Sequence, residues 1–273
     1  MEKVTAETLV RSSRRMHGHV VIAANGHRYF AKSPLPDYCE GRAVMGAKIA
    51  AVCGVKTVEP AQVIFDEEFV ARFASSNAPE FDGYTPSLHA GTFFGTRFPT
   101  NPDCTAIWDM LPVKSAMQIR NPLDFSIMRT ADCWIANARP GRAIFVRQPE
   151  KDLVAYMLGF GRCFSFAETE LPRSWNWSFA PLVSPARWEK AVDTIEVIRR
   201  ITKSNLEEMM SEIPSDWWRG IGPSAPQIIE TLLSRQSKVG QMLMELRRRE
   251  TGLPTRKSVH VETVLGLARR SSA

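Results

Sequence analysis

Histidine and cysteine, the side chains that most often bind metals or carry redox chemistry, are few in this sequence and poorly spaced for either task. The five cysteines are an odd number and include no Cys-x-x-Cys pair, so neither a disulfide framework nor a thiolate metal site is indicated. His17 and His19 would share one face of a strand, but a histidine metal site needs further ligands, and the sequence suggests none. We therefore expect no metal site and reduced cysteines, as is usual in a cytoplasmic protein.

The positive charge of the chain is concentrated near its C-terminus. The formal net charge is +6, and residues 246–273 contain seven lysines or arginines against two glutamates, which accounts for nearly all of the excess. A basic segment of this kind can bind nucleic acid or an acidic partner by neutralising phosphates. It can also be the solvated end of a helix, where the helix dipole favours arginine. The sequence leaves both interpretations open.

The composition argues against several classes of protein. Of the 273 residues, 44% are hydrophobic and 23% are charged, as in globular proteins that bury a substantial core. No window approaches the ~18 consecutive apolar residues of a membrane-spanning helix. The first residues carry charges throughout and lack the apolar segment of a signal peptide. We therefore expect neither a membrane span, nor a disulfide scaffold, nor a disordered chain, and we expect a cytoplasmic location.

Residues 1–110 show a pattern of strands with a central helix, and these elements would position Lys32. Two β-prone runs flank Asn25 and Gly26, which favour the type I′ turn of a β-hairpin. Apolar residues at helical spacing predict a helix that stops at Gly54. The predicted elements, in order, are a short helical stretch over residues 6–14, the hairpin over residues 19–32, the helix over residues 41–53 and strands over residues 61–65 and 92–98.

The remainder of the chain is mostly helical and contains one late pair of strands. The predicted elements are helices over residues 123–137, 185–202, 206–212 and 226–249, the last with a candidate break near Gly240, and strands over residues 142–147 and 153–158. Strands that precede helices predict an α+β chain of two lobes. We expect a β-rich N-lobe over residues 1–110, a mostly helical C-lobe over residues 111–250 and a basic tail over residues 251–273. The proline-rich stretch 99–122 is the best candidate hinge.

Six short segments occur along the chain in an order that is typical of one family. They are His-Arg-Tyr-Phe-Ala-Lys at residues 27–32, Lys-Ile-Ala-Ala-Val-Cys-Gly-Val at 48–55, Phe-Gly-Thr-Arg at 94–97, Ala-Asp-Cys-Trp-Ile-Ala-Asn at 131–137, Gly-Arg-Cys-Phe at 161–164 and Glu-Ile-Pro-Ser-Asp-Trp-Trp at 212–218. The segments resemble the small bacterial HipA-like kinases, relatives of the HipA serine/threonine kinases, and the order of elements resembles the protein-kinase fold. The resemblance spans residues 9–249 and rests on the set of matches. It implies a two-lobed, protein-kinase-like (HipA-like) fold and a role for ATP.

The kinase resemblance assigns roles to three residues near the first strands. A kinase needs a phosphate-binding lysine, its glutamate partner, a catalytic aspartate and oxygen ligands for Mg²⁺. Lys32 stands where the lysine is expected, although its own neighbourhood would equally suit an edge-strand lysine facing solvent. The resemblance places the partner glutamate at Ala43, and Glu40 lies about one helical turn before that position. Glu40 can reach Lys32 only if the helix begins early. An exposed glutamate in the first turn of the helix is equally consistent with the sequence. Gly18, the single glycine of a short loop, gives weak support to a phosphate cradle of backbone amides.

The resemblance also implies that the acidic positions of the kinase site are altered. Where the family carries the catalytic aspartate, two residues after Asn137, this chain has Arg139, and a permanently charged guanidinium cannot act as a general base near neutral pH. Where the family carries the metal-binding aspartate, it has Gly159, which offers Mg²⁺ no ligand. Arg139 and Arg142 would place positive charge there instead, and an arginine can bind a phosphate. We expect Asp132 to be buried and to hold the loop by hydrogen bonds, with a catalytic role as the weaker candidate.

Three functions are consistent with these residues. The leading one is a pseudokinase that lacks the catalytic and Mg²⁺-binding aspartates and binds a nucleotide, another anion or an unknown protein partner; ATP is the candidate cofactor and Mg²⁺ is in doubt. Its candidate binding residues are Lys32, Glu40, Gly18, Asn137, Arg139, Arg142 and Gly159. The second is an active ATP-dependent serine/threonine phosphotransferase with displaced catalytic residues, namely Glu40 with Lys32, and Asp132 as an acid. The third is a nucleic-acid-associated binding protein that uses the basic tail.

Overall fold

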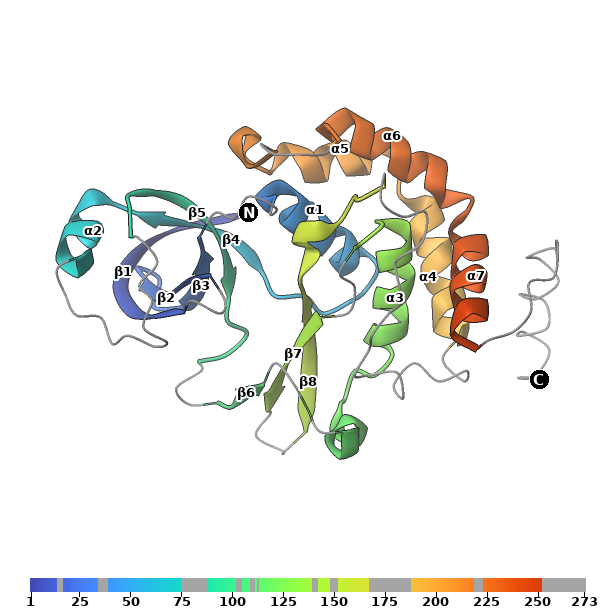
Figure 1. Ribbon diagram of the computed structural model, residues 1–273, viewed down its shortest axis with the longest axis horizontal. Coiled ribbons are helices and arrows are strands. Elements are labelled where there is room, and N and C mark those ends of the chain that lie inside the picture. The colour runs from blue at the N-terminus through green and yellow to red at the C-terminus, as the bar shows by residue number, and fades with distance from the viewer. Residues whose placement is uncertain are drawn as a thin grey trace.

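The first part of the chain forms a closed five-stranded barrel, which lies at the left of Figure 1. The structure, a computed structural model, describes residues 1–13, 17–33, 39–74, 88–101, 105–108, 111, 113–138, 142–147, 152–166, 188–218 and 223–251. The barrel strands are β1 (Glu2–Ser13), β2 (Gly18–Ala23), β3 (Arg28–Lys32), β4 (Pro60–Phe65) and β5 (Gly91–Arg97), in the spatial order β1-β2-β3-β5-β4. Neighbouring strands are antiparallel except β1 and β4, which pair in parallel and close the barrel.

The start of the barrel holds one confirmed prediction and two that are wrong. The predicted β2–β3 hairpin forms around Asn25 and Gly26. Its turn is not the predicted type I′, because Gly26 has a positive φ of 75° and Asn25 does not. The helical stretch predicted over residues 6–14 does not form, because residues 2–13 are strand β1. This strand pairs with β2 along its second half and with β4 at its start, and two β-bulges bend it around the barrel. Hydrogen bonds to two neighbouring strands outweigh a weak local preference for helix.

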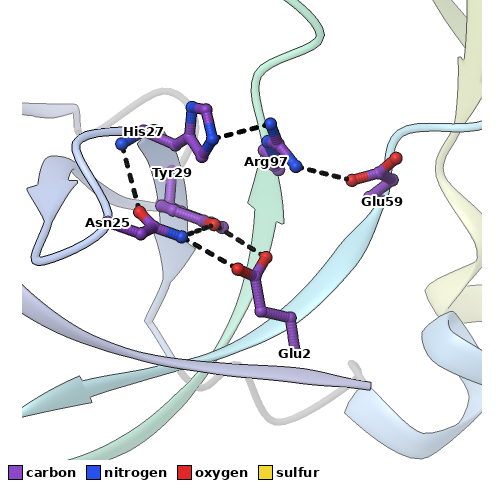
Figure 2. Close-up of polar contacts among 6 residues, drawn as sticks. All are labelled: Glu2, Asn25, His27, Tyr29, Glu59 and Arg97. Atoms are coloured by element: carbon purple, nitrogen blue, oxygen red, sulfur yellow. Dashed lines mark hydrogen bonds and ion pairs between the residues drawn. The ribbon is translucent and has the colours of Figure 1, made fainter.

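A polar network ties β1 to the hairpin at one end of the barrel (Figure 2). The carboxylate of Glu2 accepts hydrogen bonds of 2.8 Å from the side-chain amide of Asn25 and from the hydroxyl of Tyr29, a buried residue of β3. The amide of Asn25 also donates to the Tyr29 hydroxyl at 2.8 Å. The tyrosine hydroxyl therefore has both a donor and an acceptor, as a buried hydroxyl requires.

The same network continues to β5 through Arg97 (Figure 2). The guanidinium of Arg97 lies 2.8 Å from the ring Nε2 of His27 and pairs with the carboxylate of Glu59 at 3.3 Å. Because arginine can only donate, the Nε2 atom of His27 is the acceptor in this contact. Polar contacts thus connect β1, the hairpin and β5 at this end of the barrel.

The rest of the chain consists of helices and a second, three-stranded sheet (Figure 1). The helices are α1 (Glu40–Val52), α2 (Glu67–Ala74), α3 (Asp124–Trp134), α4 (Trp188–Arg200), α5 (Lys203–Ser211), α6 (Ala225–Gln236) and α7 (Val239–Thr251), and the sheet contains β6 (Ile107–Trp108), β7 (Arg142–Arg147) and β8 (Leu153–Leu158). The strands predicted over residues 142–147 and 153–158 are confirmed, and the break predicted near Gly240 separates α6 from α7. None of the helices within the described ranges is long and apolar enough to cross a membrane.

Two hydrophobic cores organise this mixed α and β structure. One fills the barrel and includes Phe65 and Phe69, whose ring centroids lie 4.8 Å apart in a tilted arrangement. The larger one joins α1, α3, β7, β8 and the C-terminal helices, with Trp134 and Phe145 fully buried. Helix α1 lies between barrel strands in the sequence, yet its buried residues belong to this larger core. Gly46 of this helix packs against Phe160 and Cys163, in the segment that follows β8.

Candidate anion-binding site

Lys32 lies at the end of β3, where it pairs with Gly18 of β2. A Cβ atom on residue 18 would lie 2.3 Å from the carbonyl oxygen of Ala31, so no other residue fits this close approach of the two strands. Packing against β3 is thus enough to require glycine at this position. Lys32 itself is half-buried.

Glu40 is the first residue of α1, so the helix does begin early enough to bring this carboxylate towards Lys32. The start of α1 is fixed by the turn that contains Trp217, whose carbonyl oxygen accepts a hydrogen bond of 3.3 Å from the thiol of Cys39. Burial raises the pKa of Glu40, and the charge of Lys32 opposes this rise, whereas the charge of Asp216 adds to it. The two groups of the expected lysine–glutamate pair therefore lie within electrostatic range of each other.

The electrostatic surroundings of Lys32 are dominated by burial and by two arginines. The pKa of Lys32 is lowered to about 7, first by burial and then by the charges of Arg142 and Arg162, while the charge of Glu40 acts in the opposite direction. A lysine ammonium is destabilised by desolvation and by like charges. Positive charge thus exceeds negative charge around this amine in the described part of the chain.

Arg142, the first residue of β7, covers the position that the sequence aligns with a metal-binding aspartate. It pairs with Leu158, the last residue of β8, and Gly159 follows in a left-handed conformation with φ of 92°. A Cβ atom on residue 159 would lie 3.1 to 3.4 Å from three carbons of the Arg142 side chain. An aspartate here would have to adopt a strained backbone and displace the arginine.

Arg162 was not among the site residues predicted from the sequence. It belongs to two adjacent segments, residues 135–138 and 162–165, which we call the loop pair. Three backbone hydrogen bonds join them: Phe164 N to Ile135 O at 2.7 Å, Ala138 N to Arg162 O at 3.1 Å and Ser165 N to Ala136 O at 3.3 Å. Ala136 and Phe164 both have positive φ angles, 46° and 63°. Non-glycine residues keep such conformations only where the surrounding structure holds them, as it does at many functional sites.

Asp132 and Asn137 support the first segment of the loop pair from within the core. Both residues are fully buried, and the side-chain amide of Asn137 donates to the Asp132 carboxylate at 2.8 Å. The backbone N–H of Asn137 donates to the Asp132 carbonyl at 3.0 Å. These are hydrogen bonds of the kind expected if Asp132 holds the loop.

Helix α1 directs another arginine towards the loop pair. Gly46, one turn after Arg42, packs so closely that a Cβ atom there would lie 2.7 Å from Phe160 and 3.0 Å from the sulfur of Cys163. Burial raises the pKa of Cys163, Asp132 adds to the rise and the charge of Arg42 opposes it. The kinase resemblance aligns Arg42 and Ala43 with the partner region of the lysine, but Arg42, like Arg162, was not among the predicted site residues.

The donor set of this site suits an anion better than a divalent cation. Arg142 and Arg162 lie within electrostatic range of Lys32, and Arg42 lies within electrostatic range of Cys163 in the loop pair. No group of three histidine, cysteine or acidic side chains within the described ranges is arranged to hold a metal. Mg²⁺ depends on carboxylate oxygens, and at the position of Gly159 it would meet the Arg142 side chain. Arg139, the predicted replacement for the catalytic aspartate, lies outside the described residues.

Comparisons with known proteins identify the fold. No family model matches the sequence, and no curated protein matches it either. The Golgi casein kinase is similar in structure, with a TM-score of 0.50 and 11% identity over 91% of this chain and 72% of that chain, and a second structure of that kinase, with Mn/ADP bound, gives 0.50 and 11% over 90% and 73%. The Helicobacter pylori proinflammatory kinase CtkA gives 0.50 and 12% over 92% and 97%. The chain therefore has a protein-kinase-like fold.

Proposed function

We propose that this chain is a HipA-like pseudokinase whose barrel and larger core correspond to the two kinase lobes, and that it binds a phosphate-bearing ligand without a divalent metal. The observation that carries this function is the Arg142 side chain lying over Gly159. Phosphoryl transfer depends on metal ions that neutralise the phosphates and on a base that accepts the substrate proton. An arginine can supply the first of these functions, as a charge that binds phosphate, but it cannot supply the second.

The charge balance around Lys32 supports an anionic ligand. Burial and two arginine charges already hold the pKa of this amine at about 7. A phosphate placed among Lys32, Arg142 and Arg162 would offset those charges, because a charge-assisted hydrogen bond is stronger in a partly desolvated site than in water. The similar kinase with Mn/ADP bound makes a nucleotide the natural first ligand to test.

A thermal-shift titration with ATP, ADP and GTP, each with and without Mg²⁺, tests the proposed function. At 100 times Kd, ligand binding stabilises the folded state by about 2.7 kcal/mol, which is a visible shift in Tm. We expect stabilisation that does not require Mg²⁺ and a loss of affinity of about tenfold or more in Arg142→Met. Arg147→Met is the matched control, since Arg147 lies at the other end of β7 with its guanidinium over Trp108. No stabilisation by any nucleotide would overturn the proposed ligand class.

One observation favours a second function, that of an active serine/threonine phosphotransferase. Glu40 begins α1 within electrostatic range of Lys32, as a working kinase pair requires. An active enzyme would show Mg²⁺-dependent stabilisation by ATP and autophosphorylation measurable by intact mass, both lost in Lys32→Ala. The absence of any phosphorylated species with several divalent metals would leave the pseudokinase as the function. The nucleic-acid hypothesis depends on the basic tail, of which residues 252–273 lie outside the described residues.

A further inference from the structure

Helix α6 contacts the end of α3 through one buried arginine. Arg235 is 9% exposed, and its Nε and Nη2 atoms donate to the carbonyl oxygens of Trp134 at 2.9 Å and Cys133 at 2.8 Å. In return, the indole N–H of Trp134 donates to the carbonyl of Leu232 in α6 at 2.9 Å. The last carbonyls of a helix lack partners within the helix, and the rigid fork of a guanidinium can satisfy two of them at once.

The same guanidinium also contacts the chain on the other side of the loop pair. Its carbon Cζ lies 5.4 Å from the centre of the Phe166 ring, within the range of a cation–π interaction. Trp134 directly precedes the segment 135–138, and Phe166 directly follows the segment 162–165. Arg235 therefore joins the entry of the first segment to the exit of the second.

On the basis of the anion site proposed above, we propose that Arg235 is a positioning residue of that site and that helix α6 sets its affinity through the loop pair. Arg235 contacts the backbone before the loop pair and a ring after it, so its action on a ligand is indirect. Through it, α6 holds Arg162 in place relative to Arg142.

The structure of the loop pair explains why it depends on the contacts of Arg235. Its two segments are joined by the three backbone hydrogen bonds given above, and two of its residues have positive φ. One of those bonds ends on the carbonyl of Arg162 itself. Without the guanidinium, the two carbonyls at the end of α3 and the ring of Phe166 lose their shared partner, and the two segments can shift against each other. Arg162 would then move relative to Arg142, which is fixed by the β7–β8 ladder.

The neighbouring residue in α6 offers a closely matched control. The side-chain amide of Gln236 donates to the carbonyls of Ile198 and Ile201 at 3.0 and 2.6 Å, so it too binds two carbonyl groups, but at the end of α4. Arg235→Met and Gln236→Leu therefore each remove a side chain that bridges α6 to the end of another helix. Only the first of these contacts borders the loop pair.

The affinity for inorganic pyrophosphate, measured by calorimetry without divalent cations, is the first readout. We expect Arg235→Met to weaken binding by about tenfold and Gln236→Leu to leave it unchanged, although both variants lower Tm. Arg235→Lys, which keeps the positive charge and one donor nitrogen, should recover part of the affinity and serves as the test if the methionine variant does not fold. In an Arg162→Met background, Arg235→Met should cause no further loss, because it acts through Arg162. Equal weakening by the Arg235 and Gln236 variants, or additive losses with Arg162→Met, would overturn the positioning role.

Amide hydrogen exchange separates failure of this role from failure of the proposed function. If the wild-type protein does not bind pyrophosphate, the proposed ligand class is wrong, and the contact between α6 and the loop pair is then judged without a ligand. The amides of Ala138, Phe164 and Ser165 should exchange faster in Arg235→Met than in Gln236→Leu, since they form the loop pair. Unchanged exchange at these three amides would show that Arg235 does not position the loops.

Discussion

The barrel and the candidate anion site each contain a basic side chain whose pKa is lowered mainly by burial, but the charged groups around the two side chains differ. In the barrel, His19 is 1% exposed, and burial, aided by the charge of His89, lowers its pKa to about 4. Its Nδ1 atom lies 2.9 Å from the hydroxyl of Ser12, a neutral partner. At the site, burial and two arginines lower the pKa of Lys32 to about 7. The barrel thus keeps its base neutral, whereas the site keeps a surplus of charge that a bound anion would offset.

The largest expected effect concerns the barrel and its stability in acid. Between pH 6.5 and about 4, the unfolded chain protonates His19 but the folded chain does not, so the free energy of unfolding falls as the pH falls through this window. The contribution is complete above pH 6.5, and its loss by pH 4 amounts to about 3 kcal/mol. Urea denaturation at pH 7 and pH 4.5 measures it, with His19→Asn as the variant that cannot titrate. Equal losses in the wild type and in His19→Asn would show that His19 does not control acid stability.

The next effect tests whether a carboxylate alone can turn the site into a metal site. We expect Gly159→Asp to lower the free energy of unfolding by about 2 kcal/mol, because residue 159 has positive φ and lies against Arg142. Gly159→Ala carries the same backbone strain without the carboxylate and is the matched control. Neither variant should acquire stabilisation by ATP that depends on Mg²⁺ in a thermal-shift titration. Such stabilisation in the aspartate variant alone would mean that the missing ligand was all that prevented metal binding.

The lowered pKa of Lys32 also predicts how anion binding depends on pH. Sulfate is a suitable probe because its own charge is constant between pH 6 and pH 9. Since a bound anion favours the ammonium form of Lys32, affinity should be nearly constant below pH 7 and should weaken up to about tenfold per pH unit above it. Lys32→Met should bind more weakly and show a flat profile. If the affinity of the wild-type protein depended on pH as little as that of the variant, Lys32 would not interact with the bound anion.

The sequence predicted those elements whose pattern is local. The hairpin and strands β7 and β8 have clear turn signals and apolar alternation, and they form where expected. Strand β1 was missed because part of its pairing is with β4, which is distant in the sequence, although its other partner, β2, directly follows it. In the same way, a motif pointed to Lys32 and Glu40, whereas Arg42 and Arg162 reach the site only through the packing of α1 on the turn after β8. The packing of Arg142 on Gly159 also depends on the β7–β8 register and has no signal in the linear sequence.

The smallest expected effect concerns the polar network at the end of the barrel. Arg97 pairs with Glu59, which is 72% exposed, and exposed ion pairs contribute little because water screens them. We expect Arg97→Met to lower the free energy of unfolding by about 0.5 kcal/mol or less and to leave pyrophosphate affinity unchanged, as urea denaturation and calorimetry can measure. Arg97 and Arg142 have the same side chain, and both lie at the end of a strand, yet only Arg142 is expected to matter for the ligand. If Arg97→Met weakened anion binding as much as Arg142→Met, the ligand would be responding to the total charge of the protein and not to an arranged group of arginines.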